Sequence, residues 1–195
     1  MKMVITNTCI TTMEIINTPI KDLIEIVPKV FNDDRGYFLE DFHEQKFLQL
    51  GLPIHVSQSN RSFSIKGALR GLHFQRSPHE QGKLVSVVSG AILDVAVDLR
   101  KSSETLGEWY STILSGENNK MLYIPPGFAH GFLAIEPSYL SYKCTSLYDP
   151  HSEGGIIWDD PTLNIDWQLA KFNVIHPIIS EKDSKFPQFK DVGLF

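Results

Sequence analysis

The chain has 195 residues, of which 42% are hydrophobic and 21% charged, and this composition is typical of one globular domain, which we expect to span residues 1–195. The formal net charge of -5 excludes a general attraction to nucleic acid or anionic membranes. No apolar stretch approaches the ~20 residues of a membrane span and no signal peptide is evident, so we expect a cytoplasmic protein. Cys9 and Cys144 lack metal-site spacing and are expected to be free thiols.

In chain order, the first clear element is a predicted helix over residues 39–51, "LEDFHEQKFLQLG", closed by Gly51 and Pro53. From residue 67 to about 148 the pattern changes to short strands that start roughly every ten residues, each bounded by Gly, Pro, Asn or Asp. They include "KLVSVVSG", "AILDVAVDLR", "EWYSTILSG", "KMLYIPPG", "HGFLAIEP" and "YLSYKCTSLY". A helical or irregular region is expected after Pro177.

The strand "AILDVAVDLR" shows the alternation of a sheet. Leu93, Val95 and Val97 fall on one face, and Asp94 and Asp98 fall on the other. Strands of this kind at this spacing predict a β-sandwich or barrel.

Two motifs refine the prediction. Gly67, His73, Gln75, Lys83 and Gly90 reproduce the frame of the first cupin motif, and "PPGFAH", which ends at His130, reproduces the second. The chain therefore resembles a cupin, which implies a mainly β, double-stranded β-helix (jelly-roll barrel) with a few short peripheral helices. Metal-binding cupins carry His and Glu where this chain has Gln75 and Lys83. Because an ammonium repels cations and attracts anions, we expect no metal and an anionic ligand.

Seven blocks in order narrow the resemblance: "FNDDRGYFLEDF", "SQSNRS", "GALRGLHFQ", "QGKLVSVVSGAILDVAVDLR", "IPPGFAHGF", "YKCTSLYDPHSEGGIIWDDP" and "SEKDSKFP". Together, from about residue 28 to 187, they resemble the dTDP-4-dehydrorhamnose 3,5-epimerase family. The resemblance implies a homodimeric, cofactor-free enzyme that inverts the carbons flanking the 4-keto group of a dTDP-linked 4-keto-6-deoxy sugar.

Epimerisation next to a ketone needs a base, an acid on the opposite face and a cation near the oxygen. His73 suits the base, because a pKa near ~6.5 leaves it largely neutral in the cytoplasm. The family pattern assigns Asp183 as the carboxylate that orients His73, and Tyr142 as the proton donor. Lys83 is the candidate for stabilising the enolate.

The resemblance also implies a set of substrate-binding positions that composition alone would leave as surface residues. Tyr148 is expected to stack on the nucleotide base, although Leu147 stands where the family often has a second Tyr. His130 is expected to hydrogen-bond substrate. The remaining members of the set are Arg35, Glu40, Gln58, Asn60, Arg70, Glu153 and Lys182.

Three alternatives stay open. A metal-dependent cupin, such as a dioxygenase or a phosphosugar isomerase, would require a divalent ion. A non-catalytic sugar-nucleotide binder would not need both a His base and a Tyr acid. An epimerase that acts on one carbon only would use the same residues in a differently shaped pocket.

Overall fold

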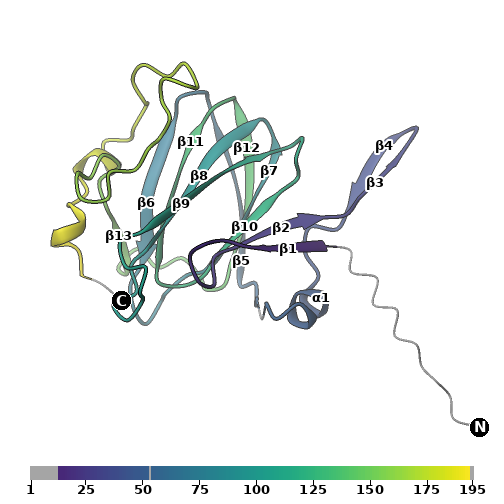
Figure 1. The fold of residues 1–195 in the computed structure, drawn as a ribbon, viewed down its shortest axis with the longest axis horizontal. Helices are drawn as coiled ribbons and strands as arrows, with labels where there is room; N and C mark the ends of the chain where they lie inside the picture. The colour runs from purple at the N-terminus through teal and green to yellow at the C-terminus, as the bar shows by residue number, and fades with distance from the viewer. Residues whose placement is uncertain (1–12, 53, 194–195) are drawn as a thin grey trace, which may run out of the picture.

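The structure, a computed structural model, describes residues 13–52 and 54–193, which form two main antiparallel sheets (Figure 1). The six-stranded sheet has the order β1 (Met13–Asn17), β2 (Ile24–Pro28), β10 (Met121–Ile124), β7 (Lys83–Ser89), β12 (Ser138–Cys144), β5 (Gln58–Ser64). The five-stranded sheet has the order β13 (Glu153–Gly155), β6 (Leu69–Gln75), β11 (Phe128–Ala134), β8 (Ala91–Asp98), β9 (Trp109–Ser115). The predicted mainly β architecture is confirmed.

The β8 strand lies at the centre of the packing because both of its faces are buried. Leu93, Val95 and Val97 contact one apolar cluster, together with the C-terminal segment. Ile92 and Ala96 point to the other side, into a cluster between the two sheets. The alternation predicted from the sequence is therefore real, but the polar face of this strand does not face solvent.

The predicted helix over residues 39–51 is shorter in the structure, where α1 spans Glu44–Gln49. Leu39 instead belongs to β4 and pairs with Val30. The buried Phe47 anchors α1 against apolar residues of the six-stranded sheet. A hairpin partner for Leu39 therefore overrides the local helix propensity.

The C-terminal segment after β13 is mostly irregular, as expected, with short 3-10 helices η1 (Asp183–Lys185) and η2 (Phe189–Asp191). The buried Asp160 carboxylate accepts hydrogen bonds from the backbone N–H groups of Leu163 and Phe189. Trp167 is buried in the cluster that also contains β8 side chains. These contacts fix the segment on the five-stranded sheet and bring η1 beside β6.

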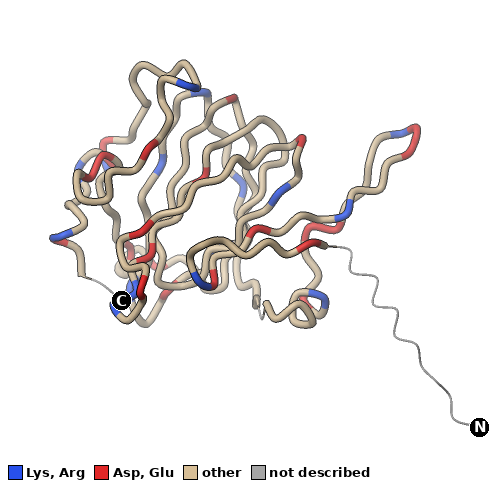
Figure 2. The backbone as a smooth tube through the Cα atoms, viewed as in Figure 1, with Lys and Arg blue, Asp and Glu red and all other residues tan. Residues whose placement is uncertain are grey.

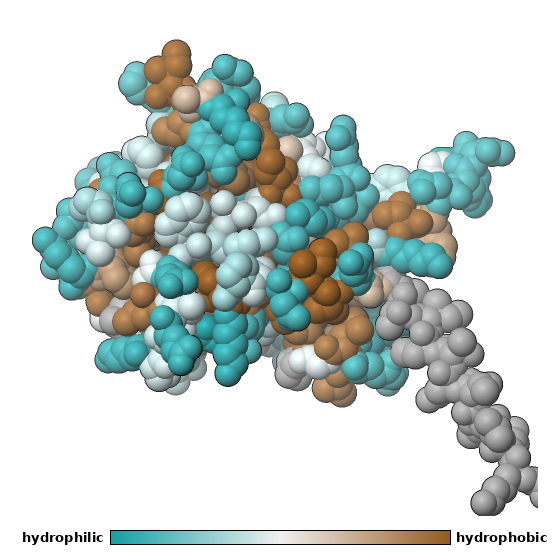
Figure 3. Space-filling view, viewed as in Figure 1, coloured by the Kyte–Doolittle hydropathy of each residue, from teal (hydrophilic) through white to brown (hydrophobic). Residues whose placement is uncertain are grey.

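A separate hairpin, formed by β3 (Val30–Asp33) and β4 (Gly36–Leu39), projects from the body (Figure 1). Its aromatic side chains are unusually open: Tyr37 is 56% exposed and Phe38 is 67% exposed. In the space-filling view, apolar atoms gather where the hairpin leaves the body, below a hydrophilic tip (Figure 3).

Candidate active site

A cavity of about 320 Å³ lies between the two sheets, at the end where β5, β6, β7 and β12 meet. Seven of the residues predicted for the site line it together, which places catalytic and nucleotide-binding candidates side by side. The full lining is Gln58, Asn60, His73, Phe74, Gln75, Gln81, Lys83, Tyr142, Tyr148 and Glu153.

His73 is supported from behind by a buried carboxylate. Its Nε2 lies 2.9 Å from Oδ1 of Asp183, while Oδ2 of Asp183 accepts a hydrogen bond from the Gly71 N–H. Because a carboxylate only accepts, Nε2 carries the ring proton and Nδ1 is the basic nitrogen. Burial alone would raise the pKa of Asp183, but the hydrogen bonds from His73 and Gly71 outweigh burial and lower it. The His73 ring is therefore oriented by an ionised partner.

A larger cavity, of about 580 Å³, lies on the other side of His73. It contains the predicted residues Arg70, Lys182 and Asp183. Arg70 is held at its wall by hydrogen bonds to Oγ of Ser64 and to the carbonyl of Phe63. Two cationic side chains next to the base make this second cavity suitable for an anionic group of the substrate.

Tyr142 and Lys83 lie on neighbouring strands of the sheet opposite to that of His73. Burial shifts the pKa values of the two side chains in opposite directions. Burial raises the pKa of the Tyr142 hydroxyl, with a smaller rise from Cys144, so the phenol stays protonated. Burial lowers the pKa of Lys83, although Cys144, Asp94 and Glu153 oppose this effect. The cavity thus keeps a neutral donor and a poorly solvated cation across from His73.

His130 pairs in register with His73 between β11 and β6. Its Nε2 lies 2.7 Å from Oδ1 of Asp94, whose side chain is fully buried. Gly71 permits this close approach of the strands, since a Cβ there would lie 2.5 Å from the Cα of Gly131. His130 is therefore oriented by a second carboxylate, that of Asp94. The alternation in the sequence placed Asp94 on the polar face of its strand but assigned no role to it.

The rim of the first cavity is a hydrogen-bonded chain. The Tyr148 hydroxyl donates to Oε2 of Glu153 at 2.9 Å, and Nζ of Lys182 lies 2.6 Å from the same oxygen. On the other side, Oε1 of Gln58 accepts the Tyr148 N–H, and its Nε2 donates to Oδ1 of Asn60. The predicted nucleotide-binding residues of the rim thus contact one another.

Arg35 and Glu40 do not join these cavities. Arg35 lies in the turn of the projecting hairpin, where its guanidinium contacts Asp33 and its side chain is 90% exposed. Glu40 follows β4 and forms an ion pair with Lys46 at 2.7 Å. Within one chain, the structure therefore separates these two predicted residues from the others.

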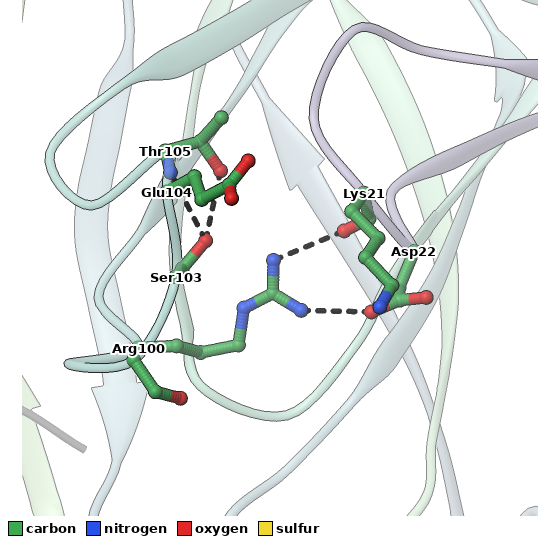
Figure 4. Close-up of a pocket in the computed structure, with 7 residues that line it drawn as sticks. Lys21, Asp22, Arg100, Ser103, Glu104 and Thr105 are labelled. Carbon is green, nitrogen blue, oxygen red and sulfur yellow. Dashed lines mark hydrogen bonds and ion pairs between the residues drawn. The ribbon is translucent and has the colours of Figure 1, made fainter.

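A further cavity, of about 370 Å³, is structural in character (Figure 4). Arg100 reaches across it to the Asp22 carboxylate and the Lys21 carbonyl, and its remaining donors bind the buried Asp98. Since these contacts occupy the donors of Arg100, it ties two loops together and offers no free cation to a ligand.

Among the described residues there is no group of three or more His, Cys, Asp or Glu side chains that could hold a metal ion. In the same part of the chain, no helix is long and apolar enough to cross a membrane.

Two antiparallel sheets, with a cavity between them that is lined by His73, Lys83 and Tyr142, define a cupin-type protein. Comparison with known proteins narrows this class. Residues 17–191 match the family model for dTDP-4-dehydrorhamnose 3,5-epimerase. The chain therefore belongs to the dTDP-4-dehydrorhamnose 3,5-epimerase family, and it is an isomerase.

Three individual relatives are similar to this chain over most of its length. A dTDP-4-dehydrorhamnose 3,5-epimerase from Methanothermobacter thermautotrophicus is 50% identical over 90% of this chain and 94% of its own. A crystal structure of the Legionella pneumophila dTDP-6-deoxy-D-glucose-3,5-epimerase, in complex with dTDP-4-keto-L-rhamnose, has a TM-score of 0.88 at 45% identity and covers 93% of this chain and 95% of its own. A 3'-monoepimerase from Streptomyces bikiniensis, in complex with dTDP-quinovose, has a TM-score of 0.81 at 34% identity, with 88% and 85% covered. The predicted cupin-type fold and family are confirmed.

Proposed function

We propose that this protein inverts carbons 3 and 5 of dTDP-4-dehydro-6-deoxyglucose to give dTDP-4-dehydrorhamnose, with His73 as base and Tyr142 as acid. The observation that carries the proposal is the placement of both side chains in one cavity, on strands of opposite sheets. A sugar ring held between the sheets would present one face to each residue.

In the proposed step, Nδ1 of His73 takes the proton from the carbon next to the ketone. The resulting imidazolium is stabilised by the ionised Asp183, and the electron pair moves onto the carbonyl oxygen to form an enolate. Tyr142 then returns a proton to the carbon from the opposite face. A phenol is suited to this role, because it stays protonated until a strong base forms beside it.

Lys83 supplies the charge that the enolate needs. Its strand brings it into the same cavity as His73 and Tyr142, where burial from solvent strengthens its field. His130, held by Asp94, would hydrogen-bond the sugar. These interactions would stabilise the enolate-like transition state more than the bound ketone, which is the condition for faster reaction.

The remaining predicted residues would hold the dTDP portion. Tyr148 would stack on the thymine base, Glu153 would accept a hydrogen bond from a sugar hydroxyl, and Lys182 would bind a phosphate oxygen near it. Arg70 would contact the diphosphate from the second cavity, and Gln58 and Asn60 would complete the nucleotide end.

We also propose a homodimer, in which Arg35 and Glu40 reach the partner's site. The exposed aromatic side chains of the hairpin support this proposal, because such side chains are usually covered in an assembly. A cytoplasmic location is part of the same proposal, since the free, buried Cys144 beside the cavity suits a reducing compartment.

The test is incubation with dTDP-4-dehydro-6-deoxyglucose in deuterated water, followed by NMR. Deuterium at carbons 3 and 5 with inversion at both supports the proposal; His73→Ala should abolish exchange while the protein stays folded. Deuterium and inversion at one carbon would instead favour a monoepimerase, the alternative raised by the similarity to the Streptomyces enzyme. Activity that is lost on chelation and recovers only with a divalent ion would favour a metal-dependent cupin.

A further inference from the structure

Gln75, which stands where metal-binding cupins carry a ligand, has a different task in this structure. Its side chain is almost entirely buried, with 4% of the residue exposed. Its Nε2 donates to the carbonyl of His79 at 2.7 Å and to the carbonyl of Leu147 at 3.1 Å, and its Oε1 accepts the Asp149 N–H at 2.8 Å. The amide is therefore fully used by backbone groups.

These bonds connect two loops that form one wall of the first cavity. One loop follows β6 and the other follows β12, and the residues bonded between them are 65 to 74 positions apart in the sequence. Gln81 and Ser146 add further bonds between the same loops, through the carbonyls of Ser146 and Glu80. Of all these contacts, those of Gln75 fall on the two residues that flank Tyr148 in the chain.

We infer that Gln75 is a positioning residue for Tyr148. It fixes the backbone immediately before and after this tyrosine, while Gln58 fixes the Tyr148 N–H and Glu153 fixes the hydroxyl. Tyr148 is 52% exposed and has little packing of its own to hold the ring in place. A preorganised ring binds a base more tightly, because less side-chain and loop freedom is lost on binding. The inference rests on the proposed role of Tyr148 as the base-stacking residue.

A glutamine side chain fits these contacts, whereas the substitutes closest to it in shape or position in the motif do not. Glutamate would place an acceptor against the carbonyls of His79 and Leu147, and Met or Leu would leave both carbonyls and the Asp149 N–H without partners. A neutral histidine has a single ring donor and could not serve both carbonyls. The residue type that removes a metal ligand from the cupin frame therefore also supplies the bridge between the loops.

The first experiment measures dTDP binding by calorimetry, together with kcat and KM for the dTDP-sugar. Gln75→Glu should weaken dTDP binding roughly 10- to 100-fold, the effect of leaving buried groups unpaired, while kcat changes only a few-fold. Gln75→Met, which conserves volume, gives the same test if the charged variant folds poorly. Gln49→Met, at an exposed position on α1, is the matched control and should leave both quantities unchanged. Unchanged dTDP binding in folded Gln75→Met would overturn the inference.

The second experiment distinguishes a positioning residue from one that merely stabilises the fold. In a Tyr148→Ala background, Gln75→Met should weaken dTDP binding far less than it does in the natural sequence, because the ring that it positions is gone. Equal losses in the two backgrounds would contradict the inference and leave the proposed function intact. If Tyr148→Ala alone bound dTDP normally, base stacking by Tyr148 would be wrong, and the inference would be overturned with it.

Discussion

At the scale of single residues, burial in the cavity acts differently on the pKa of Tyr142 and on the pKa of Lys83. A buried environment favours neutral forms, so it keeps Tyr142 protonated but works against the charge on Lys83. The nearby side chains of Asp94 and Glu153 partly offset this effect, because their electrostatic attraction raises the pKa of Lys83. The proposed enolate-stabilising role of Lys83 should therefore be lost at lower pH than for a solvated lysine, whereas burial protects the proposed donor role of Tyr142 against rising pH.

Tyr142→Phe tests the division of labour between the two faces of the sugar. His73 and Lys83 remain, so proton removal should survive, while inversion should fall by roughly 10²- to 10⁴-fold, as is typical when a general acid is lost. Deuterium should still enter with the original stereochemistry, returned by His73. NMR of deuterium content and configuration on one sample measures both quantities. Equal losses of exchange and inversion would contradict the two-face mechanism.

The pH profile tests Lys83. Because its pKa is lowered by burial, kcat/KM should fall with rising pH at a midpoint below the ordinary value of ~10.4, as the ammonium loses its proton. Burial raises the pKa of Tyr142, so this group should lose its proton only above the ordinary value for a tyrosine. Lys83→Arg keeps a permanent charge and should move this limb to higher pH, even if its maximal rate is lower. A limb that stays at the same pH in Lys83→Arg would assign it to another group.

At the scale of elements, the loop between β8 and β9 depends on one buried carboxylate. Asp98 accepts hydrogen bonds from Arg100, Ser103 and Thr105. Arg100 carries the connection on to Asp22 (Figure 4). Burial opposes ionisation of Asp98, but the hydrogen bonds from these partners outweigh it and lower its pKa to about 2. The ionised form is therefore the one that the fold stabilises.

Asp98→Asn should lower the free energy of unfolding at neutral pH by about 2 kcal/mol, which is the pKa difference expressed as energy. Since the folded pKa is below the unfolded one, this stabilisation is complete above about pH 4 and is lost as pH falls toward 2. Denaturant melts at several pH values measure the effect. Asp22→Asn, which removes the more exposed partner of Arg100, should cost under about 1 kcal/mol. A natural protein and an Asp98→Asn variant of equal stability at pH 7 would refute the role of Asp98.

Local signals in the sequence predict some elements of the fold and not others. Strand periodicity and turn residues were enough for β7 to β12, because alternation and Gly, Pro or Asn boundaries are local signals. The motif frame singled out His73 and Lys83, and the family resemblance singled out Tyr142; in the structure all three line one cavity. Local signals did not reveal that Leu39 belongs to a hairpin, nor that Gln75 bridges two loops, because these facts depend on partners that are distant in the chain.

At the scale of the whole molecule, the projecting hairpin is the feature that a single chain leaves unexplained. Its tip carries acidic and basic residues together (Figure 2). The two cavities, in contrast, are lined by residues between 58 and 183. In a two-fold symmetric dimer, each hairpin would lie against the other subunit, and the exposed Tyr37 and Phe38 would be covered. Arg35 and Glu40 would then act in a site whose base, His73, belongs to the partner.

Mixing two inactive variants tests this arrangement. One variant carries Arg35→Ala and Glu40→Ala in an otherwise intact chain, and the other carries His73→Ala with an intact hairpin. If the hairpin serves the partner, a mixed dimer contains one complete site, in which the natural His73 of one chain meets the natural hairpin of the other. Epimerase activity should therefore reappear after the two variants are unfolded together and refolded. If each hairpin serves its own chain, both sites of the mixed dimer are defective and no activity returns.

The reciprocal mixture supplies the control. A chain that carries all three substitutions is refolded with the natural chain and the mixed dimer is isolated by two affinity tags. With exchanged hairpins, the natural His73 faces a defective hairpin and the natural hairpin faces a site without its base, so the mixed dimer should be inactive. With hairpins that serve their own chain, the natural subunit keeps a complete site and the mixed dimer retains activity. The two mixtures must therefore give opposite results, and a fully active monomer at micromolar concentration would contradict the dimer itself.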